Sequence, residues 1–526
     1  MTLRRRAIAS IRGQIAALIN RFAPDHYKRI IERRHAGVKV LPDASSDVRS
    51  LKDKSLEQVL HALDGLNLPI LARIDERHYW IVLADSGSDS NTVQTLIYEL
   101  LDCGLRVNVT IEGGLTVPIA GKKHLRELMR KKPARIQSIK AGTVWMRDRG
   151  YRNIGWHTAV RVYFYDWNEA QGAYCARTSS IVPPMIDKQT QSRGATVAGL
   201  SGSESRLDLI RFPIDVVYTW VDGNDQVWNE KRKARASEIG HKLHKTANSQ
   251  TRYINRDELR YSLRSLYYYA PWVRNVFLVT DDQVPDWYDS DSKDLTIVSH
   301  KELFPDESTL PTFNSHSIES VLHRIPGLSE HFLYMNDDVL LSGIVQPESF
   351  FEVSGICRAF LSRAMIPFCA KEKSDVASEW GVMNTNELLR EACGVTMPYK
   401  TKHTPIALRK SFLADLESRF SEQFRSLRER PFRTANDLAP TSSLHACFGL
   451  AEGKVVRGSI AYRYLNLARS DLAEALDVIA YDTQPFVYCL NDTEIDDQRG
   501  FDWVDQERLI TDFLKWMYPY QAPWEI

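Results

Sequence analysis

Short apolar segments alternate with amphipathic ones over the second half of the chain. Mainly apolar runs at 214–220 (IDVVYTW), 276–280 (VFLVT) and 332–335 (FLYM) are typical of buried strands. Between the first two lies the segment 256–269 (RDELRYSLRSLYYY), which we predict to be a helix. Short apolar strands that alternate with helices predict an α/β domain with a largely parallel sheet.

The first half of the chain has a different pattern. Predicted strands at 79–84 and 160–165 flank a predicted helix at 92–103, so residues 50–186 read as a small α+β accessory domain. A polar stretch rich in Gly and Ser follows, and we expect a linker over 187–211. The α/β domain then occupies 212–526.

Positive charge is concentrated in two places. Residues 1–34 contain nine Lys and Arg against two Asp and Glu, and their apolar residues recur at steps of three and four, which predicts a basic amphipathic helix. This helix either packs on its own domain or attaches to an anionic membrane surface. Residues 122–152 contain eleven Lys and Arg against two acids and form either a solvated face or a groove for an anionic acceptor.

The overall composition excludes several classes of protein. The chain of 526 residues has a net charge of +1, so nothing global indicates a nucleic-acid partner. Its seven cysteines are scattered without zinc-finger spacing, as expected of reduced thiols in the cytoplasm. No apolar run approaches the roughly 20 residues of a membrane span. We expect a cytoplasmic protein, with peripheral contact to the inner membrane face as an open alternative.

Acidic residues follow the predicted strands of the α/β domain. Asp222 follows the first strand, the pair 281–282 the second, and Asp337 and Asp338 come directly after FLYM. In open α/β sheets the ligand crevice lies at the carboxyl ends of the strands. Paired carboxylates there favour a divalent cation, and Mg²⁺ (or Mn²⁺) also binds substrate phosphates. A later apolar run, PFVYCL, likewise ends at Asp492.

Two further segments carry chemistry-bearing residues. Pro311 opens a predicted helix in which His316, Glu319 and His323 recur at steps of three and four, so that acid and imidazole share one face. Taken alone, His403 and Arg433 are unremarkable, because single histidines are usually structural or exposed.

The order of these segments is similar to that of a known family. IDVVYTWVDGND, the block from RDELRYSL to VPDW, the block from LPTFNSHS to MNDDV, and the block from KHTPIALRKSF to PFRTAND resemble the four-part signature of the Stealth family. CLND and the closing APWE fit as well. The resemblance covers roughly 212–526, and it is closest to the bacterial capsular and exopolysaccharide phosphotransferases. Their catalytic core is similar to that of the animal N-acetylglucosamine-1-phosphotransferase.

The resemblance implies a modified GT-A-like fold that binds a nucleotide sugar. The implied reaction transfers a sugar-1-phosphate from a UDP-sugar to a hydroxyl of a glycan acceptor and releases UMP, in capsule or exopolysaccharide synthesis alongside capsule assembly proteins. By position in the matched blocks, the implied catalytic residues are Glu319, Asp338, His403 and Arg433. The expected donor-binding residues are Asp222, Gly223, Arg260, Asn336 and Asp337, and the expected metal ligands are Asp338 and Asp492.

Each implied catalytic residue suits one part of this chemistry. A neutral imidazole at His403 takes the proton of the attacking hydroxyl. The guanidinium of Arg433 binds the charged phosphoryl oxygens with paired hydrogen bonds. Asp338 holds the cation or acts on its waters, and Glu319 orients His403 or the sugar. Two alternatives stay open: a conventional glycosyltransferase that releases UDP, and a non-catalytic scaffold that binds anionic glycans.

Overall fold

The computed structural model describes most of the chain, in two compact units that comprise 1–206 and 207–526. The division lies inside the segment expected to be a linker. The described residues are 39–40, 48–64, 66, 70–74, 80–85, 90–131, 135–142, 145–146, 159–178, 184–187, 210–240, 253–343, 345–367, 377–481, 487–491, 503–518 and 521–526. The predicted basic helix of 1–34 and the predicted metal ligand Asp492 lie outside them. No helix among the described residues is long and apolar enough to cross a bilayer.

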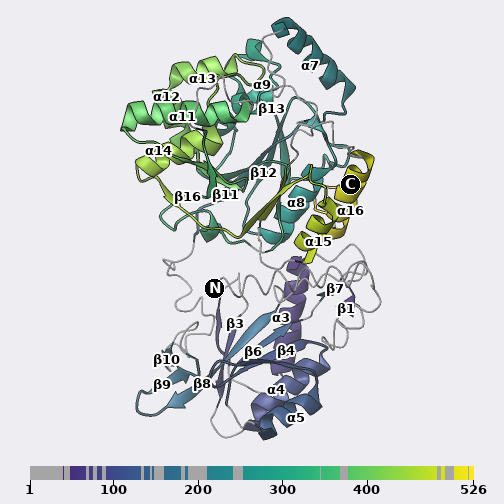
Figure 1. Ribbon diagram of the computed structural model, residues 1–526. Helices are drawn as coiled ribbons and strands as arrows, with labels where there is room; N and C mark the ends of the chain where they lie inside the picture. The colour runs from purple at the N-terminus through teal and green to yellow at the C-terminus, as the bar shows by residue number, and fades with distance from the viewer. Residues whose placement is uncertain are drawn as a thin grey trace. The chain divides into compact units, whose positions relative to one another are not determined.

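The first unit is built on a mostly antiparallel sheet. Its strands follow the order β10-β9-β8-β6-β4-β5, β3 pairs in parallel with β8, and β2 pairs with β3. Figure 1 shows α3, α4 and α5 against this sheet. The elements are α3 (Val48–Asp64), β2 (Ile70–Ile74), β3 (Trp80–Asp85), α4 (Ser90–Asp102), β4 (Arg106–Ile111), β5 (Thr116–Ile119), α5 (Lys122–Lys131), β6 (Ile136–Gly142), β8 (Val160–Asn168), β9 (Ala173–Ala176) and β10 (Met185–Asp187), with a separate pair of β1 (Lys39–Val40) and β7 (Trp145–Met146).

Strand periodicity explains the core of this unit. In β4 the side chains of Val107, Val109 and Ile111 are buried while their neighbours are partly exposed. These residues pack with apolar positions of α3, α4, β6 and β8 in one cluster. Alternate residues of a strand face opposite sides of the sheet. The buried residues of β4 therefore lie on the face that the helices cover. The α+β class expected for this part of the chain is confirmed.

The second unit contains a five-stranded sheet in the order β13-β12-β11-β14-β19. The first four strands are parallel, and β19 runs antiparallel to β14. Their bounds are β11 (Ile214–Thr219), β12 (Val276–Thr280), β13 (Leu295–Ser299), β14 (His331–Met335) and β19 (Ile406–Arg409). Every residue of β12 and the first five of β11 are buried, as expected of central parallel strands covered on both faces. The predicted α/β class is confirmed.

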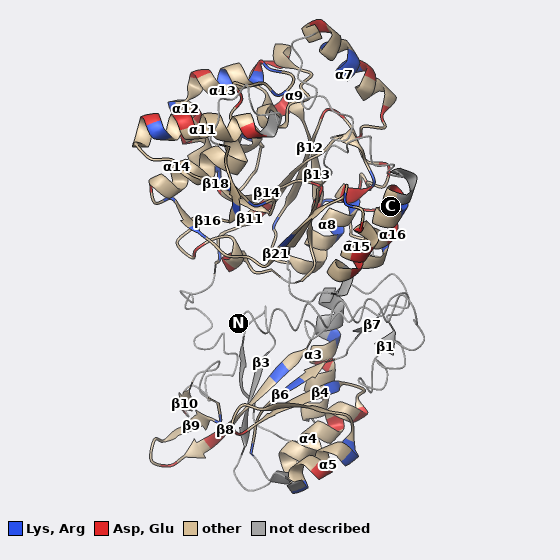
Figure 2. Cartoon of the chain, in the orientation of Figure 1, with Lys and Arg blue, Asp and Glu red and all other residues tan. Residues whose placement is uncertain are grey.

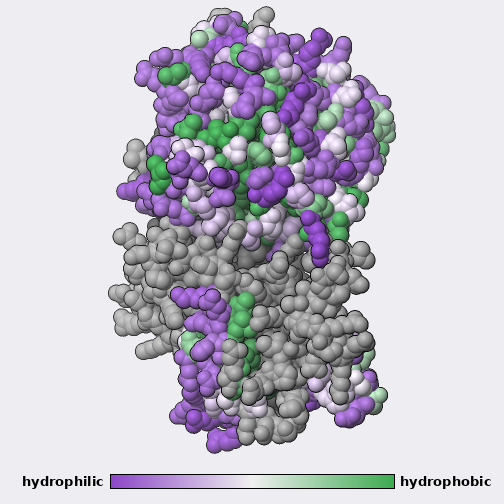
Figure 3. All heavy atoms as spheres, turned by 180° about the vertical axis from the view of Figure 1, so that it is seen from behind, coloured by the Kyte–Doolittle hydropathy of each residue, from purple (hydrophilic) through white to green (hydrophobic). Residues whose placement is uncertain are grey.

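Helices cover both faces of this sheet. Figure 1 shows α11 to α14 on one side of the central strands and α8, α15 and α16 on the other. The helices are α7 (Gln226–Ile239), α8 (Glu258–Tyr269), α9 (His300–Leu303), α10 (Ser315–Glu319), α11 (Ala377–Cys393), α12 (Lys410–Arg419), α13 (Ser421–Arg428), α14 (His445–Ala451), α15 (Leu472–Tyr481) and α16 (Trp503–Met517). Charged residues of both signs lie on α7, α12, α13 and α16 in Figure 2. On the face in Figure 3, hydrophobic residues of this unit gather at the centre, within a mainly hydrophilic surround.

The strand order reverses between β11 and β14, the position at which open α/β sheets form their ligand crevice. The chain proceeds from β11 outward to β12 and β13 and then returns to the other side of β11 as β14. At such a reversal the loops leave the carboxyl ends of two neighbouring strands in opposite directions. Tyr218 pairs with Met335 at these ends. The residues that follow, 220–225 and 336–338, therefore border one crevice.

A smaller sheet begins directly after residues 336–338. It has the order β15-β22-β21, with β15 (Val339–Leu341) antiparallel and β21 (Tyr462–Asn466) parallel to β22 (Val487–Asn491). Two further pairs join β16 (Cys357–Ala359) with β20 (Val455–Arg457) and β17 (Leu361–Met365) with β18 (Tyr399–Thr401).

One predicted element was wrong. The helix expected to begin at Pro311 begins at Ser315, capped by the Asn314 side chain, and ends at Glu319. A separate 3₁₀ turn then carries His323. His316 and Glu319 share α10 as expected, but His323 does not belong to that helix and instead contacts the Glu417 carboxylate at 2.7 Å. The predicted cluster of all three residues on one helix face therefore does not form.

Candidate active site

The loop after β11 is fixed by contacts within the protein. The Asp222 carboxylate accepts a hydrogen bond from the Asn224 backbone at 2.9 Å, and its backbone N–H donates to the Gln283 side chain at 3.0 Å. A Cβ on Gly223 would lie 1.8 Å from the Tyr253 carbonyl oxygen. Glycine is therefore required here by the close approach of the 253 backbone. The expected donor contact of Asp222 and Gly223 stays a prediction.

The turn after β14 presents the Asp338 carboxylate to the small sheet. The Val339 N–H donates to the Asn336 carbonyl at 3.2 Å and closes the turn. Asp338 Oδ2 accepts from Cys489 Sγ at 3.3 Å and from Asn491 Nδ2 at 3.4 Å. Asp338 Oδ1 is buried and has no hydrogen-bond partner among the described residues. One oxygen of this carboxylate is thus held in place while the other is available to a ligand.

The neighbouring carboxyl group has an altered protonation equilibrium. Burial raises the pKa of Asp337 to about 8, and the carboxylates of Asp338 and Glu258 add to the effect. Asn336, the third expected donor-binding residue of this turn, is exposed. The turn after β14 thus carries three consecutive polar side chains, and the expected donor contacts of Asn336 and Asp337 stay predictions.

His403 reaches the same turn from another part of the chain. It is exposed, in the loop between β18 and β19, and its ring lies edge-on to Tyr464 with ring centres 5.7 Å apart. One ligand atom each of His403, Asp338 and Cys489 lie within 4.8 Å of one another. Two of the four expected catalytic residues are thus adjacent.

Glu319 and Arg433 form a second group. Glu319 ends α10 and is buried, and its Oε2 accepts a hydrogen bond from Thr441 Oγ1 at 2.6 Å. Arg433 Nη2 donates to Ser315 Oγ at 2.7 Å, and Ser315 begins the same helix. The five-residue α10 therefore brings the acid and the guanidinium to one place.

Tyr334, on β14, is influenced by charged residues of both regions, the turn after β14 and the group of Glu319 and Arg433. Its hydroxyl forms a hydrogen bond of 2.9 Å with Thr219 Oγ1 at the end of β11. Burial and the charges of Glu319 and Asp337 raise the pKa of this phenol well above its usual range, while Arg433 opposes them. Glu319, Arg433 and Asp337 therefore all act electrostatically on one phenol between the central strands.

Arg260, the remaining expected donor-binding residue, is bound within the protein. Its Nε donates to Glu525 Oε2 at 2.6 Å, and Arg264 Nη2 contacts the same oxygen at 2.6 Å. The Glu525 side chain is fully buried. The pair thus ties the C-terminal segment to α8, and a contact of Arg260 with the donor stays a prediction.

Several contributors to the site were not singled out from the sequence. Cys489 was interpreted only as a buried thiol, and Thr441 was not noted. A signal existed for the first: Cys489 and Asn491 are two apart in a strand, so they face the same side. No local signal pairs Thr441 with Glu319, because 122 residues separate them.

The donor atoms at Asp338 bear on the expected cation. Mg²⁺ is held by oxygen atoms, commonly one or two carboxylates together with waters and substrate phosphates. The unpartnered Asp338 Oδ1 fits that pattern. Among the described residues, however, the set that gathers around Asp338 also includes a nitrogen and a sulfur donor. The site therefore suits a divalent cation without selecting Mg²⁺.

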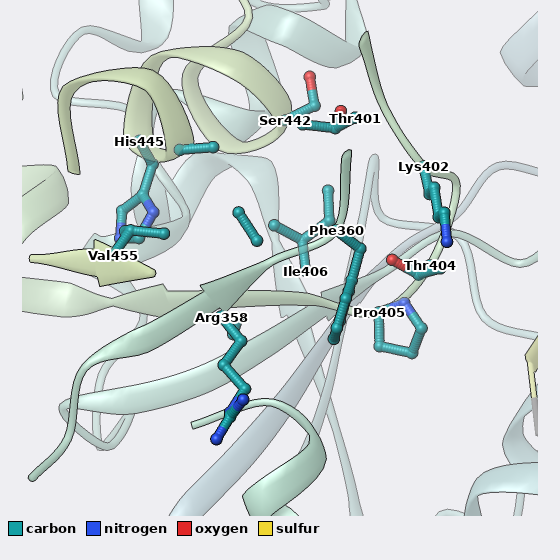
Figure 4. Close-up of a pocket in the computed structure, with 13 residues that line it drawn as sticks. Arg358, Phe360, Thr401, Lys402, Thr404, Pro405, Ile406, Ser442, His445 and Val455 are labelled. Atoms are coloured by element: carbon teal, nitrogen blue, oxygen red, sulfur yellow. The ribbon is translucent and has the colours of Figure 1, made fainter. Parts of the chain in front are cut away.

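A cavity adjoins the segment that carries His403. It is lined mainly by apolar residues such as Phe360, Ile406 and Val455, with Lys402 and Thr404 at one side (Figure 4). His445, at the opposite side, is buried, and its Nε2 accepts the Arg409 N–H at 3.2 Å. His403 itself is not among the lining residues. The cavity is therefore separate from the cluster around Asp338.

Three regions of the chain match conserved regions of one protein family. Residues 212–240 match "Stealth protein CR1, conserved region 1", residues 252–359 match "Stealth protein CR2, conserved region 2", and residues 402–446 match "Stealth protein CR3, conserved region 3". Together they include Glu319, Asp338, His403 and Arg433.

Several relatives share the name exopolysaccharide phosphotransferase. Exopolysaccharide phosphotransferase SCO2594 of Streptomyces coelicolor is 42% identical over 337 residues, which are 64% of this chain and 54% of that protein. Exopolysaccharide phosphotransferase SCO6023 of the same organism is 34% identical over 496 residues, 90% of this chain and 82% of that protein. Exopolysaccharide phosphotransferase CpsY of Mycobacterium leprae is 34% identical over 375 residues, which are 70% of this chain and 61% of that protein. The chain thus spans little more than half the length of SCO2594.

Solved structures give weaker similarities. A galactosyltransferase LgtC in complex with donor and acceptor sugar analogues aligns with 57% of this chain and 95% of its own at 11% identity and a TM-score of 0.29. Mouse xyloside xylosyltransferase 1 aligns with 53% of this chain and 98% of its own at 12% identity and a TM-score of 0.27. The α/β class of the second unit therefore rests on its own sheet topology. On the three matched regions and the extended match to SCO6023, the chain belongs to the Stealth family.

Proposed function

We propose that this chain transfers a sugar-1-phosphate from a UDP-sugar to a hydroxyl group of a glycan acceptor, with release of UMP, in the synthesis of an exopolysaccharide or capsule. The names of its relatives support phosphotransfer as the reaction type. The observation that carries the proposal is the proximity of the His403 imidazole to the Asp338 carboxylate at the carboxyl end of β14. A proton acceptor and a cation-binding oxygen then face one crevice.

The reaction forms one P–O bond and breaks another. The acceptor oxygen attacks the β-phosphorus of the donor while a ring nitrogen of His403 takes the hydroxyl proton. The bond between the β-phosphorus and the bridging oxygen breaks, and UMP leaves with that oxygen and the electron pair. The product is a phosphodiester that joins the transferred sugar to the acceptor.

Arg433 and Glu319 act on the phosphoryl group and its surroundings. The guanidinium, anchored through Ser315, binds the phosphoryl oxygens, where charge develops as the new bond forms. Glu319, held by Thr441, keeps the guanidinium and the sugar in position. We assign Glu319 this positioning role because it ends α10, the helix whose first residue, Ser315, accepts the hydrogen bond of Arg433.

Asp338 Oδ1 is the proposed contact for Mg²⁺ or Mn²⁺, with Asp492 as a second ligand that lies outside the described residues. When bound, such a cation neutralises the diphosphate and makes UMP a better leaving group. Asp222, Gly223, Asn336 and Asp337, at the ends of β11 and β14, are the proposed contacts of the donor.

Product analysis tests this proposal. The purified chain is incubated with a panel of UDP-sugars, a glycan acceptor and Mg²⁺, and the nucleotide product is separated by chromatography. UMP together with a phosphodiester resonance in the ³¹P NMR spectrum is the expected result. Release of UDP instead would show a conventional glycosyltransferase and overturn the proposed bond cleavage.

A variant tests the proton acceptor. His403→Ala should lower kcat by about 10²- to 10⁴-fold, the usual contribution of a general base. His403 is exposed, so the unfolding midpoint should not change. His61→Ala, at another exposed histidine, is the matched control and should keep full activity. Retention of wild-type kcat in His403→Ala would remove it as the base.

We also propose that the reaction takes place at the cytoplasmic face of the plasma membrane, with residues 1–34 as the attachment. Their excess of positive charge supports binding to anionic lipids. The full chain should sediment with vesicles that contain phosphatidylglycerol, and the binding should weaken as salt rises. Unchanged sedimentation after deletion of 1–34 would reject the attachment.

A further inference from the structure

An oxygen of Asp338, a nitrogen of His403 and the sulfur of Cys489 lie close together. The Cys489 thiol lies 3.3 Å from Asp338 Oδ2, and a ring nitrogen of His403 completes a set whose members lie within 4.8 Å of one another. Cys489 is fully buried, Asp338 is half-buried, and His403 is exposed. The thiol thus forms the base of the cluster, and the imidazole stands at its open side.

The spacing suits a tetrahedral cation. With bonds of about 2.3 Å to sulfur and about 2.1 Å to oxygen, a tetrahedral site separates the two donors by about 3.6 Å. The observed 3.3 Å between Cys489 Sγ and Asp338 Oδ2 is close to that value. Because His403 is exposed, its side chain has room to rotate by the small distance that remains. Three protein ligands leave the fourth position for water or an anion.

The chemistry of the donors decides which cation this is. Thiolate and imidazole are ligands of Zn²⁺ and similar cations, whereas Mg²⁺ takes oxygen ligands. A thiolate and a carboxylate also balance the charge of a divalent ion. This arrangement is therefore better matched to Zn²⁺ than to the magnesium expected for phosphoryl transfer.

We propose that Asp338, His403 and Cys489 form a binding site for Zn²⁺, and that zinc bound there inhibits the enzyme by occupying the nitrogen lone pair of His403. On binding, Cys489 loses its proton to solvent and the sulfur lone pair forms the bond to zinc. The imidazole, coordinated through its lone pair, no longer accepts a proton from the acceptor. The inhibition rests on the proposed function, while the binding of zinc does not.

Spectroscopy with Co²⁺ tests the binding directly. The full chain is freed of metal with a chelator and titrated with Co²⁺, which substitutes for zinc and reports a thiolate ligand by a near-ultraviolet charge-transfer band. Tetrahedral coordination adds intense visible bands. We expect both to saturate at one equivalent and to disappear when Zn²⁺ is added. Octahedral spectra without a charge-transfer band would overturn the site.

Variants assign the band to this cluster. Cys489→Ser should abolish the charge-transfer band, whereas the control Cys393→Ser, at an exposed thiol, should keep it. Should Cys489→Ser fail to fold, as circular dichroism would show, His403→Gln provides the test at an exposed position. We expect it to weaken zinc binding by at least about 100-fold, the upper end of the loss seen when an outer-shell partner is removed. Unchanged affinity in His403→Gln would overturn the site.

An activity assay tests the inhibition separately. UMP release is measured at saturating Mg²⁺ with increasing free Zn²⁺, and the half-inhibitory concentration should match the zinc dissociation constant from competition with Co²⁺. Cobalt binding to the cluster without inhibition by zinc would overturn the regulatory part alone. If no UMP is released even without zinc, the proposed function fails, and the cobalt spectra still decide the site.

Discussion

Replacement of Glu417 should reveal how the segments that carry Glu319 and Arg433 are held. Glu417, on α12, contacts His323 Nε2 at 2.7 Å and Arg324 Nη2 at 2.8 Å, and it also pairs with Arg428. His323 and Arg324 lie in the 3₁₀ turn that comes after α10, and Arg428 ends α13 shortly before residue 433. One carboxylate therefore joins the two pieces of chain from which the second group of site residues projects.

The size of this contribution follows from the protonation equilibrium of the carboxyl group. Burial by itself raises the pKa of Glu417, but the hydrogen bonds from His323 and Arg324 and the charge of Arg428 outweigh it and lower the pKa from 4.5 to about 2. At 1.36 kcal/mol per pH unit, this difference corresponds to about 3 kcal/mol of stability. The side chain is only 15% exposed, so solvent screens the interactions weakly.

The sign of the pH dependence is fixed by the same values. Between pH 2 and 4.5 the unfolded chain binds a proton at Glu417 that the folded chain does not, so stability falls as the pH falls. The contribution is complete above about pH 5 and is lost as the pH approaches 2. Glu417→Gln removes the charge and should cost about 3 kcal/mol at pH 7 and progressively less toward pH 3.

Urea unfolding followed by tryptophan fluorescence at several pH values measures this difference. The control Glu391→Gln, at an exposed position of α11, should change stability by less than about 0.5 kcal/mol at every pH. A stability difference between wild type and Glu417→Gln that is as large at pH 3 as at pH 7 would refute the reasoning. It would show that the pairing does not depend on the charge of the carboxylate.

Three further substitutions test the site. Gly223→Ala places a Cβ 1.8 Å from the Tyr253 carbonyl oxygen, so the two backbones must move apart, and urea unfolding should show a loss of about 1–3 kcal/mol; an unchanged midpoint would contradict the close approach. Thr441→Val removes the hydroxyl bound to Glu319 and should lower kcat for UMP release, with a stability cost of about 1–3 kcal/mol. Arg433→Lys keeps the positive charge but removes the paired N–H donors of the guanidinium, so kcat for UMP release should fall at least about tenfold. A kcat equal to that of the wild type would exclude paired contacts to phosphate.

The central strands and their acidic ends could be predicted from the sequence. β11, β12 and β14 are largely buried and therefore appear as mainly apolar runs, interrupted in β11 by the buried Asp215. The polar residues that follow β11 and β14 border the crevice. The predicted bounds of β12 agree with the observed strand at both ends. This part was predictable because burial and strand length are local properties of the chain.

The partners of the site residues were not predictable in the same way. Glu319 depends on Thr441, and the end of α10 at Glu319 could not be inferred from spacing, since His323 continues the helical pattern four residues later. In the fold, His323 lies in a separate 3₁₀ turn and contacts Glu417, which is far along the chain. A periodic pattern therefore indicated a shared face that the fold does not form.

The cluster around Asp338 shows how strand pairing creates chemistry from unrelated segments. Val339 and Tyr464 both pair with Cys489, on opposite edges of β22. This register brings the turn after β14 to the thiol, and the Tyr464 ring packs against His403 from the other side. A shift of one residue in β22 would turn Cys489 and Asn491 to the opposite face, because side chains alternate along a strand. The position of His403 over Asp338 therefore depends on the pairing of three short strands, and this dependence connects the proposed base, the proposed cation contact and the proposed zinc site.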